Sequence, residues 1–175
     1  MVARKRGKRS SVSQALFMPL SVLDLEVEHQ NKRDIQRIKE VHLAFSASSF
    51  QLDPVKNVLA LFLSEVLFRV VKDTQPDERM YAFLTDSVRI LDSVEQGLAN
   101  FHVAFLLNLL HYLGIFPNVE HPRDALYFDM LNGIFVCQQP THPYYLQPAE
   151  TVVFQRLLKM SYENMSLYAF SRQDL

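Results

Sequence analysis

The spacing of hydrophobic residues changes character near residue 50. Before it, the run Leu23-Asp24-Leu25-Glu26-Val27-Glu28 alternates apolar and acidic residues, which predicts a strand within residues 16–28 with one packed and one solvated face. Pro19 would lie at an edge or a bulge of that strand. Residues 34–45 end in a second alternating run and predict another strand, or a short helix followed by a strand. Two strands alone form a marginal sheet, so we expect further strands upstream or support from the residues that follow.

Beyond Leu52 the hydrophobic period becomes helical. Asp53-Pro54 is typical of a helix start, because an aspartate accepts hydrogen bonds from unpaired backbone N–H groups and proline suits the first helical position. The helix predicted from Pro54 to about Lys72 is apolar nearly all round, which favours a place at the centre of a bundle. Within it, Glu65 and Arg69 are spaced to form a pair on the helix surface.

Three more helices and the beginning of another are predicted after residue 76. An irregular insertion, residues 118–147, separates them and contains a probable hairpin turn at Asn132-Gly133. Gly97 is expected to cap the first of these helices, and the second is expected to stop at Gly114. The predicted helices cover residues 77–96, residues 98–112, a segment from about residue 148 and, only as a beginning, residues 164–175.

Charge is distributed unevenly along the chain. Residues 1–39 hold nine Lys and Arg against four Asp and Glu, whereas residues 40–175 hold nine against fifteen, so a formal net charge of −1 conceals a basic head and an acidic body. Such a head suits a polyanion, and nucleic acid is the first candidate; a solvated tail is the alternative. Five cations fall within the first nine residues, namely Arg4, Lys5, Arg6, Lys8 and Arg9.

Composition excludes several function classes. One cysteine, Cys137, allows neither an internal disulfide nor a four-thiolate zinc site. With four glycines and no glycine-rich phosphate-binding motif, ATP hydrolysis is not expected. The basic head is followed by polar residues rather than an apolar signal segment, and charges interrupt every long apolar run. We therefore expect a cytoplasmic protein without a membrane association.

No residue set predicts catalysis or metal binding. None of the six histidines forms a metal-binding i,i+4 pair, and His102 and His111 lie on opposite faces of their predicted helix. Cys137 is expected to be a small buried residue rather than a nucleophile. Phe17, behind the basic head, is the better candidate for stacking on a base, although packing remains the favoured interpretation. The other singled-out aromatics are expected in the core: Phe62, Phe68, Phe83, Phe101 and Phe105.

Several segments, read in order, resemble the RecO family of recombinational DNA-repair mediators, in particular its Bacteroidetes-like branch. The specificity lies in their order and spacing, because no single segment is a catalytic signature. The segments are Leu16-Phe17-Met18-Pro19-Leu20-Ser21-Val22-Leu23-Asp24-Leu25-Glu26-Val27, Asp53-Pro54-Val55-Lys56-Asn57-Val58-Leu59-Ala60-Leu61-Phe62-Leu63-Ser64-Glu65-Val66-Leu67, Gly97-Leu98-Ala99-Asn100-Phe101-His102, Leu113-Gly114-Ile115-Phe116-Pro117-Asn118 and Tyr127-Phe128-Asp129-Met130-Leu131-Asn132-Gly133.

The resemblance implies a mostly α fold, in which a helical bundle domain follows a partial OB-type β-barrel. On this basis residues 1–50 form the nucleic-acid-binding domain, and residues 51–175 form the helical domain with its insertion. Family members usually start with further strands and continue past Leu175, and the zinc-binding members hold four cysteines in the insertion, where this chain has only Cys137. We therefore expect a chain shortened at both ends, without zinc and without another cofactor.

The resemblance also implies a function without enzymatic activity: binding single- and double-stranded DNA, annealing complementary strands and loading recombinase with a RecR partner. The C-terminal tail of single-strand-binding protein is a further expected partner, and the protein would be associated with the nucleoid. OB folds bind single strands through cationic grooves and stacked aromatics. The alternative is a helical protein-interaction module without DNA binding of its own. The DNA-binding residues expected are Arg4, Lys5, Arg6, Lys8 and Arg9, with Lys32, Arg33, Arg37 and Lys39 as weaker candidates.

Overall fold

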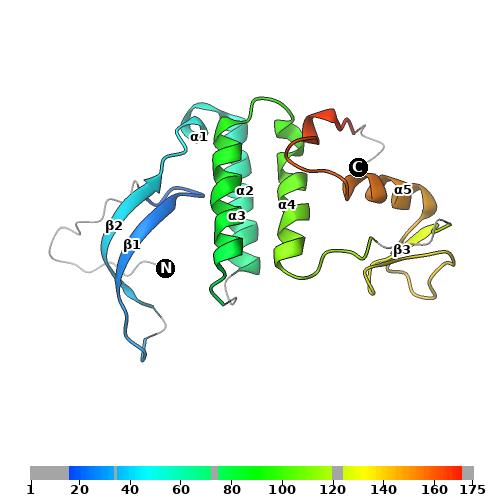
Figure 1. Ribbon diagram of the computed structural model, residues 1–175, viewed down its shortest axis with the longest axis horizontal. Helices are drawn as coiled ribbons and strands as arrows, with labels where there is room; N and C mark the ends of the chain where they lie inside the picture. The colour runs from blue at the N-terminus through cyan, green and yellow to red at the C-terminus, as the bar shows by residue number, and fades with distance from the viewer. Residues whose placement is uncertain (1–15, 34, 72–74, 120–123, 171–175) are drawn as a thin grey trace. The chain divides into compact units, whose positions relative to one another are not determined.

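The computed structural model describes residues 16–33, 35–71, 75–119 and 124–170. The chain divides into two compact units, residues 1–76 and residues 77–175, and each is considered by itself (Figure 1). This division groups the first long helix with the strands that precede it. The boundary expected near residue 50, between a nucleic-acid-binding domain and a helical domain, stays a prediction.

The first unit contains the antiparallel hairpin predicted by the alternating pattern. Strands β1 (Val22–Glu28) and β2 (Arg37–Phe45) pair with Leu25 opposite Val41 and Val27 opposite Ile38. In this register the apolar side chains of both strands lie on one face of the hairpin, and the charged side chains lie on the other face. The predicted OB-type barrel is not confirmed, because the described strands of this unit form a sheet of two.

The first strand begins later than predicted, because the chain turns ahead of it. The N–H of Ser21 donates to the carbonyl of Met18 at 3.0 Å, which places Pro19 and Leu20 at the centre of a turn rather than in a strand. Leu20 adopts a positive φ of 56°, the only described non-glycine residue to do so. A left-handed leucine costs about 1–2 kcal/mol, so its side-chain contacts must offset that strain.

Helices α1 (Ser49–Leu52) and α2 (Pro54–Val70) complete this unit. Asp53 caps α2 as predicted, since its carboxylate accepts from the N–H groups of Val55 and Lys56. The expectation that α2 lies at the centre of a bundle is not confirmed, because its buried apolar residues are Ala60 and Leu63, and Phe68 is 66% exposed. Periodicity reports which residues are apolar, whereas burial depends on what lies against them. Further exposed apolar residues on α2 are Val55, Val58, Leu61, Phe62 and Val70.

Three α-helices form in the described residues of the second unit. They are α3 (Glu78–Ser93), α4 (Phe101–Tyr112) and α5 (Pro148–Leu157), with a short 3₁₀ turn, η2 (Leu98–Asn100), leading into α4. Gly97 does not cap α3 as predicted, because that helix already ends at Val94, three residues earlier. Its positive φ of 76° instead begins η2. Gly114 ends α4 as predicted, with a φ of 70°.

Buried aromatic rings hold α3 and α4 to the C-terminal segment. Tyr162 stacks on Phe101 with ring centroids 5.1 Å apart, and its hydroxyl donates to the Ser87 hydroxyl at 2.8 Å. The Ser87 hydroxyl donates in turn to the Phe83 carbonyl at 2.7 Å. Burial raises the pKa of Tyr162, so this phenol stays protonated and remains a donor. Burying the Phe101 ring, which is fully covered, contributes about 1.5–3 kcal/mol.

The C-terminal segment returns to the start of α4 (Figure 1). The side-chain amide of Asn100 donates to the carbonyls of Met165 and Tyr168 at 2.9 and 2.8 Å and fixes this return. The helix predicted over residues 164–175 is wrong within the described residues, where only a 3₁₀ turn, η3 (Met165–Leu167), forms. Nucleating a helix costs free energy, and the hydrogen bonds from the Asn100 side chain stabilise a different backbone conformation of this segment.

The insertion folds into a small sheet with the strand order β4-β3-β5. Strands β3 (Tyr127–Asp129) and β4 (Ile134–Val136) flank the predicted turn at Asn132-Gly133, whereas β5 (Tyr145–Leu146) was not predicted. Phe128 packs against Phe135 and against Phe154 of α5, with centroids 4.8 and 4.6 Å away. Cys137 is exposed, contrary to expectation, because it follows the end of β4 rather than lying within this core.

Gly97 packs so closely against the C-terminal segment that no side chain fits there. A Cβ atom at this position would lie 2.8 Å from the backbone nitrogen of Ser166, whereas one at Gly114 would meet nothing within 4 Å. We expect Gly114→Ala to lower the free energy of unfolding by about 1 kcal/mol through its positive φ, and Gly97→Ala to lower it by clearly more. Urea unfolding of both variants checks this, and equal losses would contradict the close contact.

The half-buried ring of His102 on α4 predicts an acid-sensitive stability. Burial lowers the pKa of His102, and a hydrogen bond to the backbone of Ala99 opposes this only in part. The unfolded chain therefore binds a proton more readily, so stability is full above about pH 6.5 and decreases as the pH falls below it. We expect the melting temperature to drop between pH 7 and pH 5, and the drop to shrink in His102→Gln. His111→Gln, from the same helix, is the matched control and should keep the whole drop.

Candidate nucleic-acid interface

The hairpin places four of the predicted DNA-binding residues at or near its connecting turn. Lys32 and Arg33 lie between the strands, Arg37 begins β2, and Lys39 follows two residues later. All four are exposed. In Figure 1 this turn is the end of the hairpin farther from α1. The other five candidates, Arg4, Lys5, Arg6, Lys8 and Arg9, lie outside the described residues.

The side chain of Gln36 shapes the turn. Its amide oxygen accepts from the N–H of Gln30 at 2.7 Å, and its amide nitrogen donates to the carbonyls of Gln30 and Arg33 at 3.2 and 2.6 Å. The N–H of Arg33 also donates to the Gln30 carbonyl at 3.0 Å. One residue therefore satisfies several backbone groups that a connecting loop leaves unpaired, and it fixes the backbone that carries Lys32 and Arg33.

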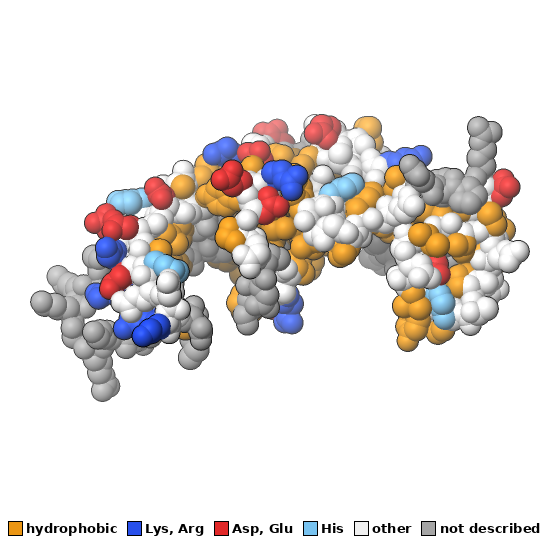
Figure 2. Space-filling view, turned by 60° about the horizontal axis from the view of Figure 1, so that its bottom comes forward, with side chains coloured by type: hydrophobic (Ala, Val, Ile, Leu, Met, Phe, Trp, Pro, Cys, Tyr) orange, Lys and Arg blue, Asp and Glu red, His pale blue; other side chains and the backbone are white. Residues whose placement is uncertain are grey.

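Three of the cations have no acidic partner in the described part of the chain. No carboxylate there lies within 4 Å of the charged groups of Lys32, Arg33 or Arg37, since each ion pair found involves other residues. Exposed, unpaired cations attract a polyanion without first breaking an internal pair. Figure 2 shows blue side chains at this end of the first unit, interleaved with red ones.

Lys39 has a different environment. Its ammonium lies 3.3 Å from the carboxylate of Glu26, where the pairing register shifts between Glu26 and Val27. Glu26 stands directly opposite Glu40, and two like charges at such a position repel each other. Lys39 offsets this repulsion, so it has an internal role in addition to its predicted contact with DNA.

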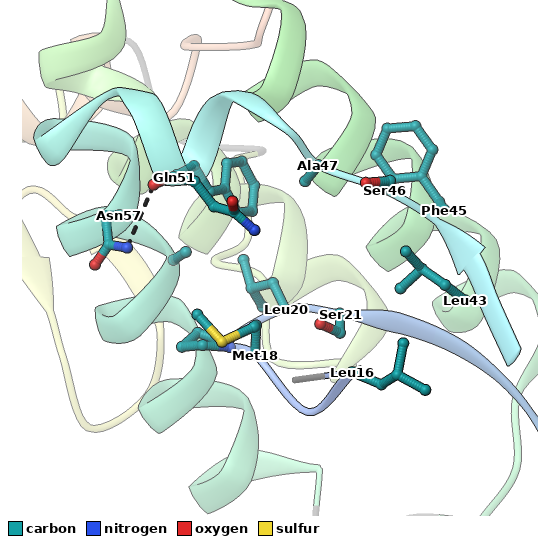
Figure 3. A pocket seen from close by; sticks show the side chains of 13 residues that line it. Leu16, Met18, Leu20, Ser21, Leu43, Phe45, Ser46, Ala47, Gln51 and Asn57 are labelled. Carbon is teal, nitrogen blue, oxygen red and sulfur yellow. Dashed lines mark hydrogen bonds between the residues drawn. The ribbon is translucent and has the colours of Figure 1, made fainter. Parts of the chain in front are cut away.

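The hairpin is attached at its other end, around a small apolar cavity of about 80 Å³. Figure 3 shows Leu20 and Met18 from the turn before β1 lying close to Gln51 and Asn57 of the two helices. The Asn57 amide donates to the carbonyl of Phe50 at 3.3 Å, joining α2 to α1. A space of this size admits one side chain and not a cofactor, so it serves the attachment of the hairpin.

The aromatic candidates divide between surface and core. Phe17 is 40% exposed, as a stacking residue would need to be, but no described contact assigns it that role. Phe83, Phe101 and Phe105 are buried as expected. Phe62 and Phe68 are exposed, against the expectation, because α2 buries only part of its circumference.

No described group of side chains has the composition of a metal site. Three or more His, Cys, Asp or Glu residues do not gather anywhere in residues 16–33, 35–71, 75–119 and 124–170.

The predicted pair of Glu65 and Arg69 is confirmed at 2.6 Å on the surface of α2. Among the described helices, none has both the length and the apolar character needed to cross a bilayer.

Sequence reasoning missed Gln36, which organises the candidate interface. A single glutamine between two strands has no distinctive spacing, and its role depends on the carbonyls that the folded turn brings within reach. The only available signal was its position, close behind the polar residues 29–33 and early in the segment 34–45 that ends in the second alternating run.

Comparison with known proteins identifies the family. The domain described as "Recombination protein O C terminal" matches residues 51–175. Two relatives named DNA repair protein RecO, from Azobacteroides pseudotrichonymphae genomovar. CFP2 and Phocaeicola vulgatus, are each 35% identical over 174 residues, covering 99% of this chain and 72% of the relative. A third, from Flavobacterium psychrophilum, is 34% identical over 176 residues, covering 97% and 71%. No solved structure matches.

These matches define a class of DNA repair and recombination proteins, and they extend over almost the whole chain. The chain belongs to the RecO family. The resemblance found in the sequence is thereby confirmed.

The contacts of Gln36 predict a measurable change in the turn. We expect Gln36→Ala to accelerate hydrogen exchange at the Gln30 amide, because that N–H loses its 2.7 Å acceptor. Gln75→Ala, at an exposed glutamine of the same unit outside the hairpin attachment, is the control and should leave exchange at Gln30 unchanged. Exchange measured by NMR decides the matter, and an unaltered Gln30 amide in Gln36→Ala would show that the turn holds without the side chain.

Proposed function

We propose that this chain acts in DNA repair by binding single- and double-stranded DNA through the turn of the β1–β2 hairpin. The observation that carries the proposal is the set of exposed cations without described acidic partners, Lys32, Arg33 and Arg37, in a member of the RecO family. Lys39 contributes a fourth contact, and the basic head extends the same interface through Arg4, Lys5, Arg6, Lys8 and Arg9. Cations on phosphates give binding that tolerates sequence and weakens with salt.

The proposed role includes strand annealing and recombinase loading. Cations that neutralise phosphates on two complementary strands reduce the repulsion between them, which favours annealing. The hairpin would belong to an OB-type domain, RecR and the C-terminal tail of single-strand-binding protein would be the protein partners, and the nucleoid in the cytoplasm would be the site of action. The proposed role is that of a mediator rather than an enzyme.

A second candidate is a helical protein-interaction module that does not bind DNA. Residues 77–175 hold eleven Asp and Glu against six Lys and Arg, so this unit repels a polyanion and suits a basic partner. The exposed apolar residues of α2 also suit a protein surface. This candidate predicts partner binding without measurable affinity for DNA.

Salt-dependent titration separates the two candidates. We expect the combined change Lys32→Ala, Arg33→Ala and Arg37→Ala to weaken binding of a fluorescent single-stranded oligonucleotide at every salt concentration. The slope of log K against log salt should become shallower by about 2, since each phosphate contact on a single strand contributes about 0.7. Replacing Arg4, Lys5, Arg6, Lys8 and Arg9 by Ala tests the head in the same way.

The matched control removes as much positive charge from the other unit, through Arg79→Ala, Arg89→Ala and Lys159→Ala. If the control and the hairpin variant lose affinity equally, the binding follows total charge and the hairpin is not the interface. Absence of DNA binding by the unaltered chain, together with capture of RecR, would favour the interaction module.

A further inference from the structure

The turn between β3 and β4 contains a chemically reactive dipeptide. Asn132-Gly133 is the only Asn-Gly pair in the sequence. In such a pair the glycine nitrogen can attack the asparagine side-chain carbonyl carbon, because no Cβ on the second residue obstructs it. The nitrogen loses its proton, ammonia leaves and a five-membered imide forms. Water then opens the imide to aspartate or isoaspartate, so the net change is gain of water and loss of ammonia.

Both reacting groups are bound by Asp129 in the folded chain. The side-chain nitrogen of Asn132 donates to one carboxylate oxygen of Asp129 at 2.7 Å, and the N–H of Gly133 donates to the Asp129 backbone carbonyl at 2.8 Å. The other carboxylate oxygen accepts from the N–H groups of Leu131 and Asn132 at 2.9 and 3.1 Å. The attacking Gly133 nitrogen and the Asn132 side chain are therefore each engaged in a hydrogen bond that the reaction would have to break.

The Asp129 carboxylate is buried and charged, which makes these hydrogen bonds strong. The residue is 6% exposed. The hydrogen bond from the side chain of Asn132 is the largest cause that lowers the pKa of Asp129, with further contributions from backbone donors and from His142. The Nε2 of His142 lies 3.2 Å from the same carboxylate, while its Nδ1 accepts from the N–H of Tyr144. Hydrogen bonds to a charged acceptor are stronger than those between neutral groups.

We propose that Asn132 is a latent deamidation site and that Asp129 keeps it unmodified by holding the Asn132 side chain and the Gly133 N–H. Deamidation would replace the amide donor of Asn132 by a second carboxylate beside that of Asp129. Two adjacent carboxylates repel each other, so the modification would open the turn. Because β3 and β4 are three residues each, this sheet has few other hydrogen bonds to resist the opening.

Mass spectrometry of the full chain tests the proposal. The chain is incubated in mildly alkaline buffer, digested, and the peptide containing Asn132 is followed for conversion to aspartate and isoaspartate. A synthetic peptide of residues 124–140 gives the rate without the fold. We expect the folded chain to react at least about tenfold more slowly than the peptide, because hydrogen bonds to a charged group must break first.

Two variants assign the protection to the Asp129 side chain. Asp129→Asn keeps the shape and the backbone carbonyl but has one acceptor oxygen in place of two and no charge, so we expect faster deamidation than in the unaltered chain. His142→Ala removes another contact of the same carboxylate without touching Asn132, and it should accelerate the reaction less. Equal rates in the folded chain and the peptide would overturn the proposal, as would an Asp129→Asn chain that folds and reacts no faster.

Should Asp129→Asn fail to fold, hydrogen exchange in the unaltered chain replaces it. We expect the Gly133 amide to exchange more slowly in the folded chain than in the peptide, since it donates at 2.8 Å. A Gly133 amide that exchanges at the peptide rate overturns the proposal. Asn132→Asp, which mimics the product, should abolish the protection of Gly133.

Discussion

The first unit depends on an apolar attachment at one end of the hairpin. Leu20, Leu43 and Phe45 meet Phe50 and Ala60 around the small cavity, and this packing joins the strands to α1 and α2. A hairpin alone is marginal in water, so its stability comes from this end. The turn that carries the cations lies beyond the reach of that packing and relies on Gln36 for its shape.

Three aspartates perform the same task at different places in the fold. Asp53 and Asp77 each accept two backbone N–H groups at the start of a helix, and Asp129 does so at the turn after β3. Backbone hydrogen bonds, above all from Arg79, lower the pKa of Asp77, just as hydrogen bonds lower that of Asp129. These three acidic residues of the body therefore have a structural purpose, and two of them, Asp77 and Asp129, lie in the unit without the hairpin.

The sequence determined those features of the fold that depend on neighbouring residues. Alternation predicted both strands, Asp53-Pro54 predicted the start of α2, and Asn132-Gly133 predicted a turn between strands, because each signal acts within a few residues. Features that depend on distant partners were missed. The C-terminal segment follows the amide of Asn100 rather than its own helical tendency, and Cys137 is exposed because of where β4 ends.

The sequence predicted where the residues of the candidate site lie along the chain, but not the contacts that their side chains make. Charge along the chain pointed to Lys32, Arg33, Arg37 and Lys39, and the hairpin brings them to or near one turn. The pairing of Lys39 with Glu26 could not be foreseen, because it requires the shifted register of the two strands. Likewise, the apolar residues of α2 indicated a helix but not how much of its circumference would be covered.

The irregular register of the hairpin also affects how molecules of this protein meet one another. Within the described residues, each strand has one edge that pairs with nothing, and such edges invite strands from other chains. The two register shifts twist the ribbon, and the facing Glu26 and Glu40 set carboxylates along it. A straight, uncharged ribbon would pair readily with strands of other molecules, whereas a twisted ribbon with charged side chains disfavours such edge-to-edge pairing.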